Sequence, residues 1–234
     1  MTSSNGLTSP LPTQDSYVVL HGESKFLIPA TIVPLDLHNS KLFDDWDLEF
    51  WELLGKLEWY RRPFVLELIQ RQASSSEKTF ILLTRFADFP ELLTECTGQE
   101  PSLQENPLSI QIQAALTVEI SEHGPTVIHN IETAPWNKLG PDHRFVSLPA
   151  AALFFFAAQH HLATGLRKKK FILSHPTEDG VTFYQKKLQL KLLWSRGPDR
   201  YAVVERESLL QALLAYKKNL EAMKQNLPTY EPKI

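Results

Sequence analysis

A long apolar helix framed by two β-rich segments constrains the fold of this chain more than any other feature. Residues 126–133 and 171–174 are rich in β-branched and apolar side chains, as strands are. The segment between them contains an apolar run that predicts a helix over 148–164. Ser147 suits the N-cap of this helix and Pro149 suits its first turn. The order strand, loop, helix, strand predicts an α/β protein.

Further strand and helix patterns cover most of the remaining chain. Pro29 lies inside a β-rich run and lacks a backbone N–H, so that run is predicted to be an edge strand at best. Residues 110–120 precede a short turn and then the strand at 126–133, which predicts an antiparallel pair. The other predicted strands cover 17–20, 26–33, 79–86, 190–194 and 200–204, and the other predicted helices cover 43–60, 64–72, 178–187 and 208–225.

Length and composition indicate one soluble, cytoplasmic domain. The chain has 234 residues, which suits a single large domain with residues 1–15 as a disordered leader, 16–227 as the domain and 228–234 as a tail. Its single cysteine fits a reducing compartment. The formal net charge of −3 does not favour a nucleic-acid partner, and no apolar run reaches the roughly 20 residues of a membrane span.

Several common chemistries lack their sequence signatures. One cysteine and eight scattered histidines make no zinc-site pattern, and we predict no metal. His160 and His161 are adjacent, so they point to different sides of a helix and are poor joint ligands. The chain contains no glycine-rich dinucleotide or P-loop motif and no GxSxG nucleophile elbow. The loop before the apolar helix is therefore the best candidate site, because free N–H groups at a helix start bind anions such as phosphates.

Four short segments resemble the GNAT superfamily of N-acetyltransferases. The strand end IETAPWN at 131–137 is similar to that of a variant group in the family, and RFVSLP at 144–149 falls where the cofactor loop belongs. FILSH at 171–175 is similar to the next strand, and FYQKKL at 183–188 is similar to the helix that follows. The resemblance implies a mixed, mostly antiparallel sheet flanked by helices, with its core in residues 110–215 and an N-terminal part at 16–109.

The same resemblance implies a site for acetyl-CoA. The pyrophosphate would contact the loop and the helix start, a set made of Asn137, Arg144, Phe145, Val146, Ser147 and Leu148. Glu132 would be the general base for an amine, with a rim carboxylate as the alternative. Tyr184 would protonate the leaving thiolate, with a packing role as the alternative.

The loop departs from the family at two positions. Ser147 and Pro149 stand where the motif has glycines, and proline cannot donate a backbone N–H to a phosphate. These changes weaken the expected binding of the pyrophosphate.

The first hypothesis, which the resemblance implies, is acetyl transfer from acetyl-CoA to an amine on a small molecule or protein. The alternative is a non-catalytic GNAT-fold scaffold that has lost the cofactor and binds a protein partner. A third option is a GNAT-fold protein that binds a different acyl carrier or a CoA-like ligand. Trp46, Trp51 and Trp59 fit a core-facing stripe of the helix predicted over 43–60, which is the favoured interpretation. The alternative is that they line the acceptor cleft or a partner surface.

Overall fold

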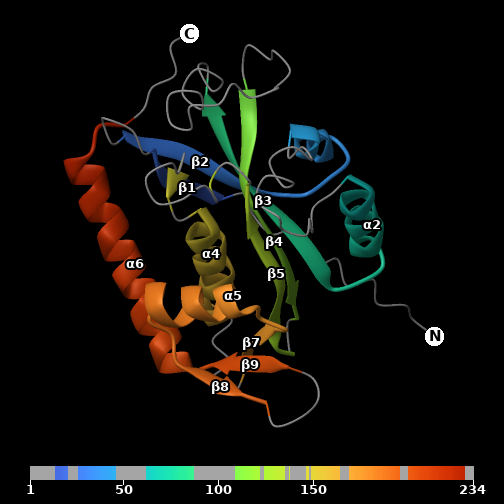
Figure 1. The fold of residues 1–234 in the computed structure, drawn as a ribbon, viewed down its shortest axis with the longest axis vertical. Coiled ribbons are helices and arrows are strands. Elements are labelled where there is room, and N and C mark those ends of the chain that lie inside the picture. Colours follow the sequence, from blue (N-terminus) through green and yellow to red (C-terminus); the bar gives the residue numbers. More distant parts are fainter. Residues whose placement is uncertain are drawn as a thin grey trace.

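The described residues form one nine-stranded sheet with helices on both of its faces (Figure 1). The computed structural model describes residues 14–20, 26–45, 62–86, 109–121, 124–134, 137, 146–147, 149–163, 169–195 and 200–229. The strands follow one another across the sheet in the order β6-β1-β2-β3-β4-β5-β7-β9-β8.

The strands and helices lie close to where the sequence patterns place them. The strands are β1 (Gln14–Leu20), β2 (Phe26–Pro34), β3 (Glu77–Phe86), β4 (Ser109–Ile120), β5 (Thr126–Thr133), β6 (Val146–Ser147), β7 (Phe171–Ser174), β8 (Leu192–Trp194) and β9 (Tyr201–Val204). The helices are the 3-10 helix η1 (Asn39–Asp45), α2 (Arg62–Gln72), α4 (Pro149–Ala163), α5 (Glu178–Thr182), the π-helix η3 (Phe183–Lys187) and α6 (Arg206–Asn226).

Pairing in the described sheet is antiparallel except between β5 and β7. The predicted fold class, an α/β protein with a mixed and mostly antiparallel sheet flanked by helices, is therefore confirmed. The predicted pair of 110–120 with 126–133 is also confirmed. These two strands, β4 and β5, lie at the centre of the sheet.

The prediction that the strand containing Pro29 would be an edge strand is wrong. Strand β2 pairs with β1 on one side and with β3 on the other. Pro29 is tolerated because pairing with β3 begins one residue later, at Ala30. Its missing N–H therefore removes no hydrogen bond to β3.

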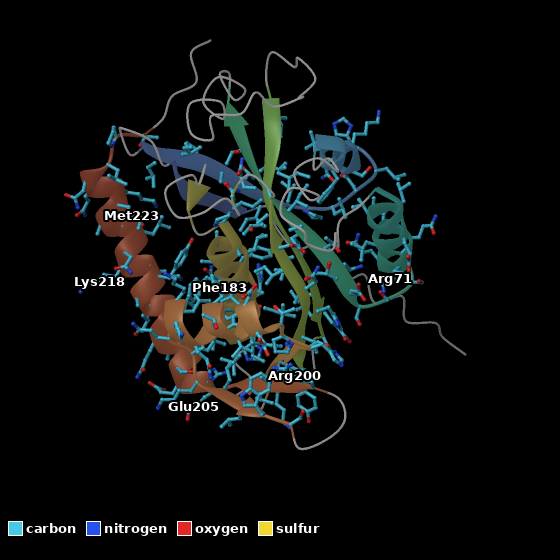
Figure 2. All side chains as sticks on the ribbon, viewed as in Figure 1. Arg71, Phe183, Arg200, Glu205, Lys218 and Met223 are labelled. Carbon is cyan, nitrogen blue, oxygen red and sulfur yellow. The ribbon has the colours of Figure 1, made fainter. Side chains whose placement is uncertain are left out.

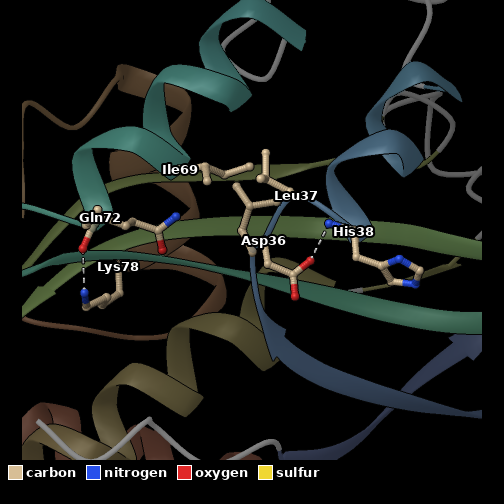
Figure 3. Close-up of a pocket in the computed structure, with 8 residues that line it drawn as sticks. Asp36, Leu37, His38, Ile69, Gln72 and Lys78 are labelled. Atoms are coloured by element: carbon tan, nitrogen blue, oxygen red, sulfur yellow. Dashed lines mark hydrogen bonds between the residues drawn. The ribbon is translucent and has the colours of Figure 1, made fainter.

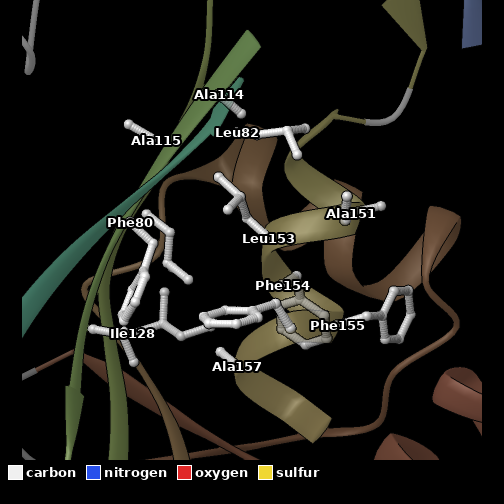
Figure 4. Packing of buried hydrophobic residues seen from close by; sticks show 14 of the residues in the cluster. Phe80, Leu82, Ala114, Ala115, Ile128, Ala151, Leu153, Phe154, Phe155 and Ala157 are labelled. Atoms are coloured by element: carbon white, nitrogen blue, oxygen red, sulfur yellow. The ribbon is translucent and has the colours of Figure 1, made fainter. Parts of the chain in front are cut away.

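Helix α4 fills the centre of the larger helical layer. It lies with α5 and α6 on one side of the sheet, and α2 lies on the other side (Figure 1). Its residues from Ala151 to Ala158 are all buried, because the sheet covers one side of the helix and α6 covers another. Phe156 meets Phe80 of β3 with ring centroids 4.9 Å apart, and Phe155 stacks on Tyr216 of α6 at 4.5 Å. Figure 4 shows buried side chains of α4, among them Leu153 and Phe154, beside Phe80 of β3, Ala114 of β4 and Ile128 of β5.

The ends of the predicted domain differ from expectation. Strand β1 begins at Gln14, two residues inside the predicted leader. The predicted tail begins at Pro228, but the Leu27 N–H donates to the Pro228 carbonyl at 2.8 Å and Thr229 bridges to Leu27. The chain therefore stays attached to β2 for at least two residues after the predicted boundary.

Some predictions fall partly or wholly outside the described residues. The predicted helix over 43–60 overlaps η1 at its first three residues, and the rest of it, with Trp46, Trp51 and Trp59, lies outside them. Strand β6 was not predicted by any pattern. In the part of the chain that the structure describes, no helix is long and apolar enough to cross a membrane.

Candidate functional site

The candidate site lies where β5 and β7 separate. The two strands pair in parallel at three positions only, from Thr126 opposite Phe171 to Ile128 opposite Leu173. Strand β7 ends at Ser174, and His175 turns the chain with a left-handed φ of 45°. Strand β5 continues as residues 129–133, which pair with β4 but with no other described strand. Open α/β sheets commonly bind ligands at the carboxyl ends of parallel strands where the chain connections diverge.

A β-bulge marks the point of separation. Asn130 lies opposite Thr117 and Ile128 lies opposite Val118, so His129 is an extra residue in β5. The bulge shifts the alternation of side chains, as an inserted residue must. It therefore determines which face of the sheet each later side chain of β5 occupies.

Glu132 lies on the α2 side of the sheet. Its neighbour Ile131 is opposite Leu116, and Leu116 is opposite Phe80, whose ring meets α4. Because side chains alternate along a strand, Glu132 points to the other face. The carboxylate is half-buried and lies beside the buried Ala115.

Tyr184 lies on the α4 side of the sheet. It is only 4% exposed, and its ring packs against Phe154 of α4 at 5.5 Å and against Phe183 at 5.4 Å. Figure 2 places Phe183 on the side of α4 and Arg71 on the side of α2. Burial raises the pKa of the Tyr184 phenol well above its usual range. The two predicted catalytic residues thus come from opposite faces of the sheet.

The helical segment that carries Tyr184 begins with a capped α-helix and ends in a π-helical turn. Thr177 caps α5 by accepting a hydrogen bond from the Gly180 N–H at 3.1 Å. The helix then widens into the π-helix η3, in which Tyr184 is the buried residue. Short π-helical turns are frequent at functional sites. The predicted helix over 178–187 is confirmed in extent, and the π-helical turn was not foreseen.

The predicted cofactor residues are placed only in part. The backbone of Val146 and Ser147 lies in β6, opposite Leu20 and Val19 of β1. Helix α4 begins at Pro149, one residue after the predicted start, which confirms Pro149 in the first turn. The prediction of Ser147 as the N-cap is wrong, because its backbone pairs with β1 two residues before the helix. Arg144, Phe145 and Leu148 lie outside the described residues. The role of each residue in this set stays a prediction.

Asn137 is tied into the protein interior. It is 7% exposed, and its side-chain amide donates to the Gln113 Oε1 at 2.9 Å and to the Gln113 carbonyl at 3.3 Å. The Gln113 amide in turn donates to the Thr84 hydroxyl at 2.9 Å. Neither Gln113 nor Thr84 stands out in the sequence, because a polar residue in an alternating strand normally faces solvent.

Asn130 is a second polar residue that the sequence patterns did not single out. Its Nδ2 atom is buried and has no hydrogen-bond partner in the described structure. A buried polar atom of this kind needs an explanation, and a ligand at the end of β5 is one. Its place next to the bulge gives it access to the region where β5 and β7 separate.

A shallow hollow of about 510 Å³ lies on the α2 side, away from these residues. It lies between α2 and η1 and is lined mainly by Leu35, Leu37, Ile69 and the polar residues around them (Figure 3). The Asp36 carboxylate accepts a hydrogen bond from the backbone N–H of His38, and the Lys78 ammonium donates a hydrogen bond to the Gln72 carbonyl. These groups hold the surrounding backbone, and no predicted site residue lines the hollow.

No family model matches the sequence, and no curated protein matches it. A comparison with solved structures finds a crystal structure of an acetyltransferase from Streptococcus agalactiae 2603, with 11% sequence identity and a TM-score of 0.41. The similarity covers 74% of this chain and 96% of that one.

Proposed function

We propose that this protein transfers an acyl group from an acyl-CoA, with acetyl-CoA as the first candidate, to an amine. The observation that carries the proposal is the end of β5. Residues 129–133 continue past β7, so backbone N–H and C=O groups on that side face the candidate site instead of a described strand. A thioester with an amide-containing arm supplies hydrogen-bonding groups that such an edge can pair with.

The same edge can stabilise the charge that develops in acyl transfer. The amine attacks the thioester carbonyl, a C–N bond forms, and negative charge collects on the carbonyl oxygen before the C–S bond breaks. A backbone N–H of β5 that points away from β4 donates a hydrogen bond to this oxygen. Donors held in place before the reaction are worth most in a site that excludes water. The buried Nδ2 of Asn130 is a further donor next to the same edge.

Glu132 and Tyr184 divide the proton transfers between the two faces of the sheet. Glu132, on the α2 side, takes the proton that the amine loses, directly or through a water. Tyr184, on the α4 side, gives a proton to the departing thiolate. A tyrosine phenol is protonated at neutral pH, as an acid must be before it reacts, and burial raises the pKa of Tyr184 further. The acceptor would thus approach from the α2 side and the acyl-CoA from the α4 side.

The loop after β5 is proposed to contact the pyrophosphate of the acyl-CoA through Asn137, Arg144, Phe145, Val146, Ser147 and Leu148. The fit is weaker here than at the acyl end. Pro149 removes one N–H from the start of α4, and the pairing of β6 with β1 engages the backbone near Ser147. We expect Pro149→Gly to strengthen CoA binding, and an unchanged affinity would show that the proline is not what weakens the cradle.

Calorimetric titration with acetyl-CoA, CoA and acetyl-pantetheine tests the proposal. We expect saturable binding of acetyl-CoA at micromolar concentration. Weaker binding of acetyl-pantetheine would show that the pyrophosphate end contributes. The absence of binding at millimolar acetyl-CoA would overturn the enzyme proposal.

A non-catalytic scaffold is the second candidate, and the placement of Ser147 and Pro149 favours it. A loop without its glycines and with its end paired to β1 provides fewer groups for a phosphate. In that case the protein binds no CoA, and its ligand is a protein partner. Acetyl transfer by the wild-type protein that Glu132→Gln abolishes would contradict the scaffold.

A further inference from the structure

Three buried polar side chains connect the sheet to the loop that leaves β5. Thr84 of β3, Gln113 of β4 and Asn137 are 1%, 0% and 7% exposed. The Asn137 amide donates to the Gln113 Oε1 at 2.9 Å, and the Gln113 amide donates to the Thr84 hydroxyl at 2.9 Å. We call this chain of hydrogen bonds the relay.

The relay exists because β4 has a bulge at Gln113. Leu82 lies opposite Ala114 and Leu83 lies opposite Ile112, so Gln113 is an extra residue with no direct partner in β3. A bulge redirects the side chain of its extra residue. Here the redirected side chain reaches Thr84 in one direction and Asn137 in the other.

Backbone hydrogen bonds strengthen the same connection. The Ala134 N–H donates to the Gln113 carbonyl at 2.9 Å, directly after the end of β5. The Asn137 N–H then donates to the Ala134 carbonyl at 3.0 Å, which closes a turn. Side-chain and backbone bonds from one residue, Gln113, therefore determine the direction in which the chain leaves β5.

We propose that Thr84, Gln113 and Asn137 are positioning residues that set the path of the loop after β5, and through it the affinity for CoA. Asn137 thus contributes from inside the protein, through Gln113, in addition to the contact predicted for it. Glycines let a loop fold around a phosphate without side-chain support. This loop has Ser147 and Pro149 at the motif positions, and the relay supplies a fixed starting point instead. The effect on CoA rests on the proposed function, whereas the effect on the loop does not.

The sheet offers a matched control for the relay. Thr79 and Thr117 form another buried side-chain hydrogen bond between β3 and β4, with hydroxyl oxygens 3.1 Å apart. Both residues are almost fully buried, and Thr117 lies opposite Thr79, four residues along β4 from the bulge at Gln113. Thr79→Val and Thr84→Val each remove one buried hydroxyl from the same strand with little change of shape. Only the second change affects the relay.

The experiment combines hydrogen exchange with CoA titration on the 234-residue chain. We expect Asn137→Ala and Thr84→Val to speed exchange in peptides containing Ala134 and Asn137 at least tenfold, and Thr79→Val and Thr84→Ser to leave it within twofold of wild type. We expect CoA to bind at least tenfold more weakly to Asn137→Ala and about fivefold more weakly to Thr84→Val. Thr84→Ser keeps the hydroxyl that Thr84→Val removes, so this variant should bind CoA as tightly as the wild-type protein does.

The two measurements separate the possible failures. Equal hydrogen-exchange rates in Thr84→Val and Thr79→Val, for peptides containing Ala134 and Asn137, would overturn the role of the relay, whether or not the protein binds CoA. Faster exchange with unchanged CoA affinity would overturn its effect on the cofactor. If the wild-type protein binds no CoA, the proposed function fails, and the proposed effect of the relay on CoA affinity fails with it. The exchange rates alone then decide whether the relay sets the path of the loop.

Discussion

The two parts of β5 differ in what surrounds them. Residues 126–128 pair with β4 on one side and β7 on the other, and Thr126 and Ile128 are buried beneath α4. Residues 129–133 pair with β4 alone and are exposed or half-buried. One strand thus holds the core together at its start and presents backbone and polar groups at its end.

The difference would let the proposed site lie at the end of β5 without a loss of stability at its start. The bulge at His129 separates the two parts, so the strand can turn its later side chains without disturbing the packing of Ile128. Changes near the start of β5 should therefore act on stability, and changes near its end should act on activity. The following predictions test that division.

The largest effect is expected for Phe154→Ala. Phe154 is fully buried under the start of β5 and meets Phe171 at 5.6 Å and Tyr184 at 5.5 Å. Replacing such a ring by a methyl group leaves a cavity and costs about 4 kcal/mol. Urea denaturation measures this loss of unfolding free energy. Leu214→Ala is the control, because this α6 side chain is 58% exposed and its loss should change stability by less than about 0.5 kcal/mol.

The next effect is a loss of stability in acid that depends on His161. This side chain is 2% exposed, and its Nδ1 lies 3.1 Å from the hydroxyl of Thr126 at the start of β5. Burial, with the charges of Lys169 and Arg206, lowers the pKa of His161 from 6.5 to about 4. The unfolded chain therefore binds a proton that the folded protein does not. Stability is complete above about pH 6.5 and falls by up to about 3 kcal/mol as the pH drops toward 4.

His161→Asn should remove this part of the acid dependence, because asparagine does not titrate. Unfolding free energies at several pH values between 4 and 7 measure it, with the exposed His38→Asn as the control. Identical pH profiles for wild type and His161→Asn would show that His161 is not the group responsible.

Local sequence patterns were enough to predict the bounds of β5 and the first turn of α4, the helix that follows it. The bounds of β5 at Thr126 and Thr133 and the start of α4 at Pro149 follow from nearby residues, namely a preceding turn and a proline suited to the first turn. Such signals depend on neighbouring residues, so they do not require knowledge of the tertiary packing. The mostly antiparallel sheet followed from the resemblance to a family.

The features at the end of β5 could not be predicted in the same way. The bulges at His129 and Gln113 depend on how two distant strands align, and no pattern within one strand reports that. The face occupied by Glu132 follows from the first bulge, and the hydrogen bond of Asn137 follows from the second. Strand β6 has only two residues and forms because β1 offers an edge there.

Glu132→Gln tests the end of β5. If this carboxylate is the general base, the change should lower kcat/KM for the amine about a hundredfold, within the usual contribution of acid–base groups. Unfolding free energy should change by less than about 1 kcal/mol, because the half-buried side chain keeps its size. A large loss of stability with unchanged kcat/KM would place Glu132 with the structural part of the strand and reverse the comparison.

Tyr184→Phe has the smallest expected effect, and it tests whether a residue packed in the core can also serve the site. Phenylalanine keeps the ring against Phe154, so stability should stay within about 1 kcal/mol of wild type. A thiol has an ordinary pKa of about 8.5, and burial raises that of Tyr184 far above it, so the proton transfer is poorly matched. We therefore expect kcat to fall only about tenfold, less than for a well-matched acid. Because the phenol stays protonated through neutral pH, its ionisation should add no alkaline limb to the wild-type rate profile below about pH 10. Unchanged kcat in Tyr184→Phe would assign this residue to packing alone, and the thiolate would then take its proton from water.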